Sequence, residues 1–349
     1  MIDARLQLAF AGMHPERVRG LLESYGPEGT LRRVRDGAIK VSPRIRAAVE
    51  VPAQQRRRQQ LDAAGIGVVF NGASGYPAAL AGMPDAPDLL FVRGSLPEAP
   101  SVAVVGSRRC TAYGRRIADQ YGRAIAEAGW LLISGLARGI DGAAHRGTVA
   151  AGGRGVAVLG SGIDVMYPRE HADLARDLIA GGGAVISEAP PGTPPEAWRF
   201  PPRNRIISGL ADVIIVVEAT VKGGALITAE SALRQGKHVL AVPGDITRAS
   251  SAGCNLLIRD GAFPVHDVED LIESLELILG PARPAVEAIP RDLDPEEEWV
   301  VALVRAGSAD IDSLVAATGN STGSLLAVLG RLELAGVVAT DGPGRYLAR

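Results

Sequence analysis

Eight short, continuous runs of apolar residues divide the middle of this chain and constrain its fold more than any other feature. Each run has the length of a strand, glycine commonly follows it, and a segment with helical spacing of apolar residues comes next. The runs cover residues 67–70, 89–92, 102–105, 130–133, 156–159, 184–186, 213–217 and 239–242. Continuous rather than alternating apolarity indicates strands buried on both faces, as in a parallel sheet covered by helices. The sequence therefore predicts a doubly wound α/β domain with an extension at its front.

The segments on either side of this domain follow other patterns. Residues 1–65 repeat apolar positions at three- and four-residue spacing, which predicts a small all-helical domain. The α/β domain then covers 66–278, and a Pro- and acid-rich linker covers 279–298. Residues 299–349 predict three helices and a hairpin, which is the arrangement of a winged helix.

Composition excludes several classes of protein. With 47% hydrophobic and 22% charged residues, the 349-residue chain can bury a sizeable core, so a disordered protein is excluded. No apolar stretch approaches the roughly 18 residues of a membrane-spanning helix, and the first residues lack the plan of a signal peptide. We therefore expect a cytoplasmic protein without a membrane partner. Cys110 and Cys254 lie far apart without metal-ligand spacing around them, so we expect neither a disulfide nor a metal site.

The formal net charge of −2 hides a strong asymmetry along the chain. Residues 1–65 carry a net charge of +5 and residues 100–265 of +4, whereas residues 267–299 carry −9. The first two segments therefore remain candidates for binding a polyanion such as nucleic acid. Residues 300–349 balance their charges, so they show no electrostatic footprint for DNA.

Glycines and cations gather where six of the predicted strands end. In an open parallel sheet, ligands bind beyond the carboxyl ends of the strands. Glycine lets an anion approach the backbone, the next helix supplies N–H groups, and arginine can hold the anion with two hydrogen bonds. Because the cations are spread along this edge, they predict an extended polyanion as the ligand. The candidate binding residues are Gly106, Ser107, Arg108, Arg109, Ser134, Gly135, Arg138, Gly139, Gly160, Gly162, Arg169, Phe200, Arg203, Asn204, Arg205, Lys222, Gly223 and Gly224.

Two features of the same edge bear on enzymatic activity. The turn 106–109 matches neither GxGxxG nor a P-loop, so we expect no dinucleotide cofactor and no ATPase. Asp141 and His145 share one face of a predicted helix and could form an acid/base dyad. No nucleophile or metal ligand accompanies them, so we favour Asp141 as a helix-start residue that pairs locally with His145.

Five blocks in this region resemble the DNA-processing protein A family, also called DprA or Smf. They are Val105-Gly-Ser-Arg108, Ser134-Gly-Leu-Ala-Arg-Gly-Ile-Asp141 with Ala144-His145, Phe200-Pro-x-Arg-Asn-Arg-Ile-Ile-Ser-Gly-Leu210, Glu218-Ala with Gly224-Ala-Leu-Ile-Thr-Ala229, and Ala241-Val-Pro-Gly244. The resemblance extends more weakly to the helical segment, as a SAM or helix-hairpin type of domain, and to the winged-helix tail.

The resemblance implies an extended Rossmann-like fold and a protein that is not an enzyme. Family members bind and protect single-stranded DNA, form a homodimer and load a RecA-type recombinase in natural transformation. Their DNA contacts correspond here to Arg108, Arg169, Phe200, Arg203 and Arg205. This sequence has a glycine at residue 223 where the family usually carries serine, so one hydroxyl contact is lost.

The resemblance also implies where two copies of the chain would meet. Family members pair through the end of the α/β domain, and the amphipathic stripe there makes Leu271, Ile272 and Leu275 the candidate dimer residues. The alternative is that this stripe packs on its own sheet.

Two other functions remain as alternatives. One is a nucleoside-monophosphate phosphoribohydrolase that resembles the Lonely Guy proteins, which carry a Gly-Gly-x-Gly-Thr-x-x-Glu loop. Residues 223–230 read Gly-Gly-Ala-Leu-Ile-Thr-Ala-Glu, so the third glycine is missing and the threonine is displaced. The other is a nucleotide-sensing regulator whose tail binds duplex DNA, which the balanced charge of the tail disfavours.

Overall fold

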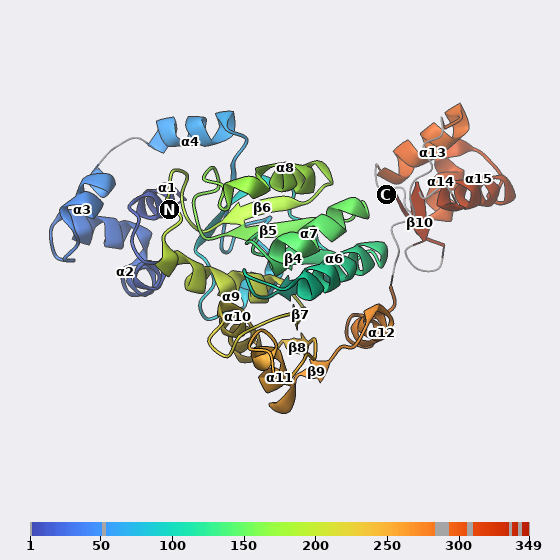
Figure 1. Cartoon of the computed structure of the whole chain (residues 1–349). Coiled ribbons are helices and arrows are strands. Elements are labelled where there is room, and N and C mark those ends of the chain that lie inside the picture. The colour runs from blue at the N-terminus through green and yellow to red at the C-terminus, as the bar shows by residue number, and fades with distance from the viewer. Residues whose placement is uncertain are drawn as a thin grey trace. The chain divides into compact units, whose positions relative to one another are not determined.

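The computed structural model describes residues 2–50, 54–282, 293–305, 310–334, 337–340 and 344–348. The chain divides into two compact units, residues 1–284 and residues 285–349, and each is described by itself (Figure 1). Among the described residues, none of the helices is both long and apolar enough to cross a membrane.

The larger unit is built on a nine-stranded sheet with the order β1-β2-β6-β5-β4-β3-β7-β8-β9 among the described residues. All eight predicted apolar runs form strands in it. The strands are β1 (Gly67–Phe70), β2 (Leu89–Gly94), β3 (Ser101–Val105), β4 (Leu131–Ser134), β5 (Gly155–Leu159), β6 (Ala184–Ser187), β7 (Val213–Val216), β8 (His238–Ala241) and β9 (Phe263–Pro264).

The sheet is parallel from β6 to β9, as predicted, but its front is not. β1 pairs antiparallel with β2, and β2 pairs antiparallel with β6. Only a short helix, α5 (Ala78–Ala81), lies between β1 and β2. A return without a long crossover makes the two strands antiparallel. The extension predicted at the front of the domain is therefore an antiparallel addition to a doubly wound sheet.

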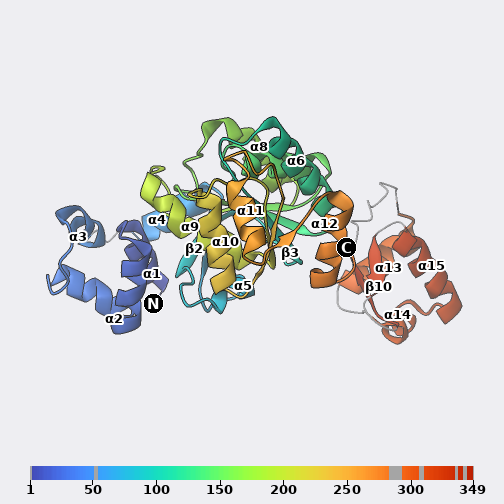
Figure 2. The same cartoon turned by 60° about the horizontal axis from the view of Figure 1, so that its bottom comes forward.

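Helices cover both faces of the sheet, as Figures 1 and 2 show. One face packs on α9 (Phe200–Leu210), α10 (Gly224–Arg234) and α11 (Ala252–Arg259). The other face packs on α6 (Ala112–Glu127), α7 (Ile140–Ala150), α8 (Ala172–Ala180) and α12 (Val268–Leu279). Two short 3-10 turns, η1 (Arg169–His171) and η2 (Ala197–Arg199), precede α8 and α9. The strands are therefore buried on both sides, which explains their continuous apolarity.

The order of strands reverses at β3. The chain runs from β3 through β4 and β5 to β6 on one side, then returns to place β7 on the other side of β3. The carboxyl ends of β3 and β7 therefore flank a topological switch point, which is where open α/β sheets bind ligands. The candidate residues of the turn 106–109 and of the loop 218–224 follow these two strands.

Four helices precede the sheet, in agreement with the predicted helical segment. They are α1 (Ile2–Phe10), α2 (Pro15–Arg35), α3 (Pro43–Glu50) and α4 (Gln54–Ala63), with a break in α2 at Gly26. Arg5 in α1 donates to the Asp88 carboxylate at 2.6 Å and to the backbone oxygen of Asn71 at 3.1 Å, which ties these helices to the sheet. The predicted domain boundary at residue 65 stays a prediction.

The smaller unit contains the elements of the predicted winged helix. They are α13 (Pro295–Arg305), α14 (Ile311–Thr318), α15 (Thr322–Leu334) and the antiparallel strands β10 (Val338–Thr340) and β11 (Tyr346–Ala348). The first helix begins at Pro295 rather than at Trp299. Asp294 accepts from the N–H of Glu297 at 2.8 Å, and Glu297 accepts from the N–H of Asp294 at 3.2 Å, which is a capping box. Acidic residues predicted as linker are thus the first turn of a helix. The rest of the predicted linker falls largely on residues 283–292, outside the described residues.

The helix predicted to form the dimer interface packs on its own sheet instead. Leu271 and Leu275 of α12 are fully buried in the same apolar cluster as Val104 and Ile215 of the sheet. Ile272 is half-buried against that cluster. The stripe is therefore occupied within one chain, and Leu271 and Leu275 are not available to a second copy.

Candidate functional site

Three loops at the carboxyl ends of neighbouring strands enclose a hollow of about 170 Å³. They follow β3, β4 and β5, and the first turn of α9 closes the hollow from the other side. We call it the Arg108 pocket; its lining residues are Arg108, Arg109, Gly135, Ala137, Arg138, Gly160, Tyr167, Pro168 and Phe200. Six of these nine residues were predicted, and the structure brings the nine together from four separate segments.

The centre of the Arg108 pocket is a stack of aromatic and cationic groups. The Arg108 guanidinium carbon lies 4.5 Å from the centre of the Phe200 ring, which lies 5.8 Å from the Tyr167 ring. Gly160 lies against the Phe200 ring, because a Cβ at residue 160 would come within 2.9 Å of that ring. A cation against an aromatic face is held in place while its N–H groups stay available to an anion.

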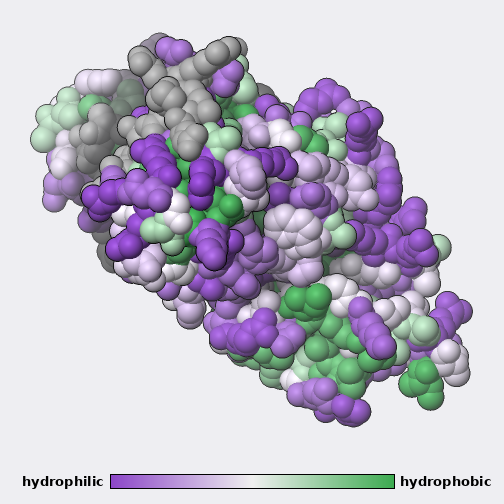
Figure 3. Space-filling view, turned by 90° about the vertical axis from the view of Figure 1, so that its left-hand side faces the viewer, coloured by the Kyte–Doolittle hydropathy of each residue, from purple (hydrophilic) through white to green (hydrophobic). Residues whose placement is uncertain are grey.

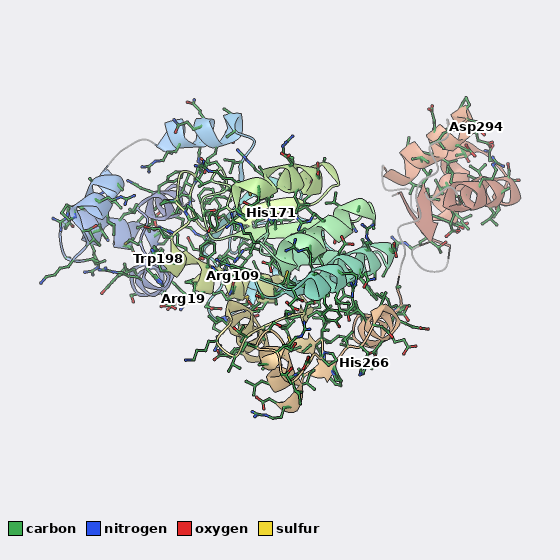
Figure 4. All side chains as sticks on the ribbon, viewed as in Figure 1. Arg19, Arg109, His171, Trp198, His266 and Asp294 are labelled. Atoms are coloured by element: carbon green, nitrogen blue, oxygen red, sulfur yellow. The ribbon has the colours of Figure 1, made fainter. Side chains whose placement is uncertain are left out.

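The cations of the pocket differ in their partners. Arg108 and Arg109 are exposed and form no ion pair with a carboxylate in the part of the chain that the structure describes. Arg138 pairs with Glu170 through two hydrogen bonds of 2.6 and 2.7 Å, and this contact holds the pKa of Glu170 below its usual range. Arg169 is exposed on η1 but does not line the pocket. Arg108 and Arg109 are therefore the cations best placed to bind an anion. Figure 4 labels Arg109 on one loop and His171 on η1.

Backbone contacts fix the loop that carries Arg108. The N–H of Ser107 donates to the carbonyl oxygen of Glu218 at 2.7 Å, and the Ser107 carbonyl accepts from the N–H of Ile140 at 3.3 Å. Gly139 has φ 80° and ψ −125°, and a Cβ there would overlap the Ser107 carbonyl oxygen. Such a backbone favours glycine. The loops after β3, β4 and β7 thus hold one another in register.

The N-terminus of α6, at the switch point, is already occupied by an anion of the protein. The buried carboxylate of Glu218 accepts from the Thr111 N–H at 2.8 Å and from the Thr111 hydroxyl at 2.5 Å. The Thr111 hydroxyl in turn accepts from the N–H of Gly114 at 3.1 Å. In dinucleotide-binding sheets the pyrophosphate lies at the corresponding helix N-terminus. Here the Glu218 carboxylate fills that position, so the N-terminus of α6 is not open to a ligand anion.

Arg203 lies beneath the pocket rather than in it. Its Nη1 donates to the carbonyl oxygens of Gly135, at 2.8 Å, and of Val158, and the side chain is buried. Burial lowers the pKa of Arg203 to about 10, and the nearby Asp141 carboxylate opposes this shift. A Cβ at Gly135 would lie 2.5 Å from Arg203 Nη1 and 2.7 Å from Asp141 Oδ2. Arg203 therefore braces the loop after β4, and a direct phosphate contact does not fit its burial.

Asp141 does not form the expected pair with His145. The Asp141 carboxylate lies near the Arg203 guanidinium, and its Oδ2 accepts from the N–H of Ala137 at 3.4 Å. Burial raises the pKa of Asp141. His145 is fully buried beside Gly155 of β5, and burial lowers its pKa to about 3. The acid/base dyad considered from the sequence is therefore not assembled either, because the two side chains serve different neighbours.

Three more candidate residues are internal. Arg205 is buried and donates to the Glu188 carboxylate at 2.8 Å, on a separate hollow of about 420 Å³ that α1 and α2 share with α9. Ser134 is fully buried and donates to the Val104 carbonyl at 2.6 Å. Gly162 is buried against residues 190–193. None of these three residues lines the Arg108 pocket.

The last group of candidates lies at the N-terminus of α10. Lys222 and Gly224 are exposed, Gly223 is the N-cap residue, and Asn204 of α9 donates to the Gly224 carbonyl at 3.3 Å. None of these four lines the Arg108 pocket. They form a separate polar edge beside α9.

Several residues that shape the site were not predicted. Tyr167 stands two residues before the predicted Arg169, and its ring is exposed at the pocket in the folded protein. Glu218 gave no signal of its own, because only the pairing of β3 with β7 brings it to Thr111. His171 supports the loop after β4, since its Nδ1 hydrogen-bonds to the Leu136 carbonyl at 2.9 Å. In the described ranges, no three His, Cys, Asp or Glu side chains cluster in a way that could hold a metal ion.

Comparison with known proteins identifies the family. Residues 67–276 match the family model of DNA recombination-mediator protein A, and residues 283–344 match that of the DprA winged helix domain. The chain is 39% identical to Protein Smf of Escherichia coli over 279 residues, which are 78% of this chain and 74% of the relative. It is 41% identical to DNA processing protein DprA of Bacillus subtilis over 214 residues, which are 60% and 72% of the two chains.

Solved structures agree with these matches. DNA processing protein A (DprA) of Streptococcus pneumoniae superposes with a TM-score of 0.65 at 33% identity, covering 77% of this chain and 95% of that one. DNA processing protein A of Helicobacter pylori, described for its single-stranded DNA binding mode, superposes with a TM-score of 0.54 at 25% identity, covering 60% and 95%. The chain is thus a member of the DNA recombination-mediator protein A family, the DprA/Smf proteins.

Proposed function

We propose that this DprA/Smf protein binds single-stranded DNA at the Arg108 pocket. The observation that carries the proposal is the Arg108 guanidinium on the Phe200 ring, with Arg109 and Tyr167 lining the same pocket. Neither arginine forms an ion pair within the described ranges. Arginine can hold a phosphate with two hydrogen bonds, and an aromatic surface can stack a base. The name of the Helicobacter pylori structure supports the same ligand class.

The shape of the pocket favours a single strand over a duplex. Its volume of about 170 Å³ and its position between three loops suit one phosphate with an adjoining base. Tyr167 is 37% exposed at the surface of the pocket. A duplex keeps its bases stacked on one another, whereas an unpaired base can stack on such a ring.

The features of the switch point argue against a nucleotide hydrolase. Glu218 occupies the N-terminus of α6, and Leu226, which stands where the rival family has its third glycine, packs against the core. Glu230, the matching carboxylate, is 67% exposed and pairs with Arg234 at 2.6 Å instead of facing a pocket. We propose that the protein acts in DNA binding without catalysing a reaction.

Fluorescence anisotropy with labelled oligothymidylate tests the proposal. If about three to five phosphates are bound, the log–log dependence of affinity on salt has a slope of about −2 to −3.5. Replacing Arg108 with Ala weakens binding to every sequence alike, because phosphate contacts carry no sequence information. Arg176→Ala, on an exposed arginine of α8, is the matched control. Binding of duplex as tight as single strand, or an Arg108→Ala variant with unchanged affinity, contradicts the proposal.

A homodimer is part of the proposal, with a different interface from the one expected. Large apolar side chains are exposed around α10 and on the edge strand β9, namely Val221, Ile227, Leu233, Ile246 and Phe263. Hydrophobic residues also gather in the lower part of the face that Figure 3 shows. An edge strand with an exposed aromatic residue is a ready site for pairing. Light scattering tests this: Phe263→Asp gives a monomer, whereas Leu326→Asp, on α15, leaves the dimer intact.

The role in recombination is the final part. Family membership supports the proposal that the protein protects incoming DNA and loads a RecA-type recombinase during natural transformation. The test measures recombinase filament formation on DNA coated with single-strand-binding protein. Wild-type protein accelerates filament formation, and the Arg108→Ala variant does not. Equal rates with and without the protein contradict this role.

A further inference from the structure

A groove between α6 and α7 concentrates positive charge outside the Arg108 pocket. Its volume is about 480 Å³, and its lining residues are Ala112, Arg115, Arg116, Asp119, Ala143 and Arg146. We call it the α6–α7 groove. All three of its arginines are exposed.

Close packing of the two helices fixes the groove. A Cβ at Gly122 would overlap the carbonyl of Ala144, so the two backbones meet at this glycine. Thr148 donates to the Gly122 carbonyl at 3.1 Å, which locks the same crossing. Figure 1 shows α6 and α7 side by side. The groove is therefore a rigid surface with small side chains, Ala112 and Ala143, between its arginines.

The charges in the groove are not neutralised within the chain. Arg115, Arg116 and Arg146 form no ion pair with a carboxylate among the described residues. Asp119, the single acidic residue of the lining, pairs with Arg123 at 2.9 Å. Three exposed arginines without acidic partners are complementary to a polyanion.

An aromatic ring stands beside these cations. Tyr113 is 41% exposed, and the Arg116 guanidinium carbon lies 5.8 Å from the centre of its ring. Cations interleaved with an exposed aromatic side chain are the combination that binds single-stranded nucleic acid without sequence preference.

The two helices of the groove both begin after loops of the Arg108 pocket. α6 begins after the loop that carries Arg108 and Arg109, and α7 begins after the loop that carries Arg138. A strand leaving the pocket along either helix therefore reaches the arginines of the groove next. Arg146 Nη1 lies 3.4 Å from His171 Nε2, next to the η1 segment behind the pocket.

We propose that a DNA strand bound in the Arg108 pocket continues along the α6–α7 groove, where Arg115, Arg116 and Arg146 bind its phosphates. The inference rests on the proposed function and extends it by a second contact region. Binding energy then depends on strand length, because a short oligomer fills only the pocket and a longer one reaches the groove.

Anisotropy with oligothymidylates of about 5 and about 20 nucleotides tests this dependence. The double variant Arg115→Glu/Arg116→Glu retains wild-type affinity for the short oligomer and loses about tenfold for the long one at low salt. Its salt slope for the long oligomer becomes less steep by about 1.4, since each phosphate contact on a single strand contributes about 0.7.

The matched control reverses two exposed arginines elsewhere, Arg176→Glu on α8 and Arg234→Glu on α10, and so has the same net charge. It retains the length dependence of the wild type. The proposed role of the groove is overturned by any of three results: an equal loss of affinity for both oligomers, no loss for the long oligomer, or the same loss in the control variant. Failure of the wild type to bind either oligomer overturns the proposed function itself.

Discussion

The N–H of Thr111 donates a hydrogen bond of 2.8 Å to the carboxylate of Glu218, at the N-terminus of α6. The two residues lie in the segments that follow β3 and β7, the neighbouring strands at which the strand order reverses. The hydrogen bond therefore joins the two sides of the switch point. A carboxylate in this position satisfies backbone groups that a ligand phosphate satisfies in nucleotide-binding sheets. The position at which such sheets bind a phosphate is therefore taken by a side chain of the protein itself.

Replacing Glu218 with Ala removes this internal anion. The Thr111 N–H and hydroxyl lose their partner in a buried place, so we expect the free energy of unfolding to fall by about 1–3 kcal/mol. Urea denaturation measures the change. Glu230→Ala, which removes an exposed carboxylate on α10, is the control and costs less than about 0.5 kcal/mol.

The vacated helix N-terminus gives a second readout of the same variant. Inorganic phosphate can occupy the position of the lost carboxylate, so it raises the melting temperature of the Glu218→Ala variant more than that of the wild type. An equal rise in both proteins contradicts the view that Glu218 takes the place of a ligand anion.

Substitutions of the buried Arg203 and of the exposed Arg108 should affect different properties, the first stability and the second DNA affinity. Arg203→Met leaves Asp141 buried without its cation, so we expect a loss of about 3–5 kcal/mol in the free energy of unfolding. Arg108→Met removes an exposed side chain, so unfolding changes by less than about 0.5 kcal/mol while DNA affinity falls. Urea denaturation and anisotropy on both variants check this. A fully stable Arg203→Met protein contradicts the bracing role.

The sequence predicts the strands and most of the pocket because both depend on local patterns. Continuous apolar runs identified eight of the nine strands of the sheet, and the glycine- and arginine-bearing segments beyond the strands identified six of the nine pocket residues. Parallel strands bring their carboxyl ends to one edge, so a list of strand ends is close to a list of neighbours. This relation holds for any parallel sheet, so it predicts neighbours without knowledge of how the side chains pack.

Burial within the site depends on packing that local patterns do not specify. Arg203 and Arg108 were both predicted as binding residues, yet the Arg203 side chain in α9 is buried against the Gly135 carbonyl, whereas the Arg108 side chain lies against the Phe200 ring. The same limit applies to Leu271, because an amphipathic helix has the same pattern whether its apolar face meets a sheet or a second chain. The contact of Glu218 with Thr111 could not be predicted from the sequence, because it depends on the pairing of β3 with β7.

The buried histidine of α7 makes stability depend on pH. The pKa of His145 falls from 6.5 to about 3 on burial, so between these values the unfolded chain binds one more proton than the folded protein. Stability therefore decreases as the pH falls, and this residue contributes a loss of about 2 kcal/mol between pH 7 and pH 5. His145→Leu removes that contribution. Urea denaturation of both proteins at the two pH values measures it, and an identical loss in the variant contradicts it.

Gly139 offers a way to move Arg108 without changing any ligand-binding side chain. At φ 80° and ψ −125°, an alanine there is strained, and its Cβ overlaps the Ser107 carbonyl, one residue before Arg108. We expect Gly139→Ala to displace the loop and to reduce DNA affinity at least about tenfold, since phosphate contacts need correct placement. The control is Gly152→Ala, where φ is also positive at 69° but no atom lies within 4 Å of the new Cβ. That variant costs about 1 kcal/mol of stability and leaves affinity unchanged. If both variants bind DNA with the affinity of the wild type, the close approach of Gly139 to the Ser107 carbonyl is not what positions Arg108 for binding.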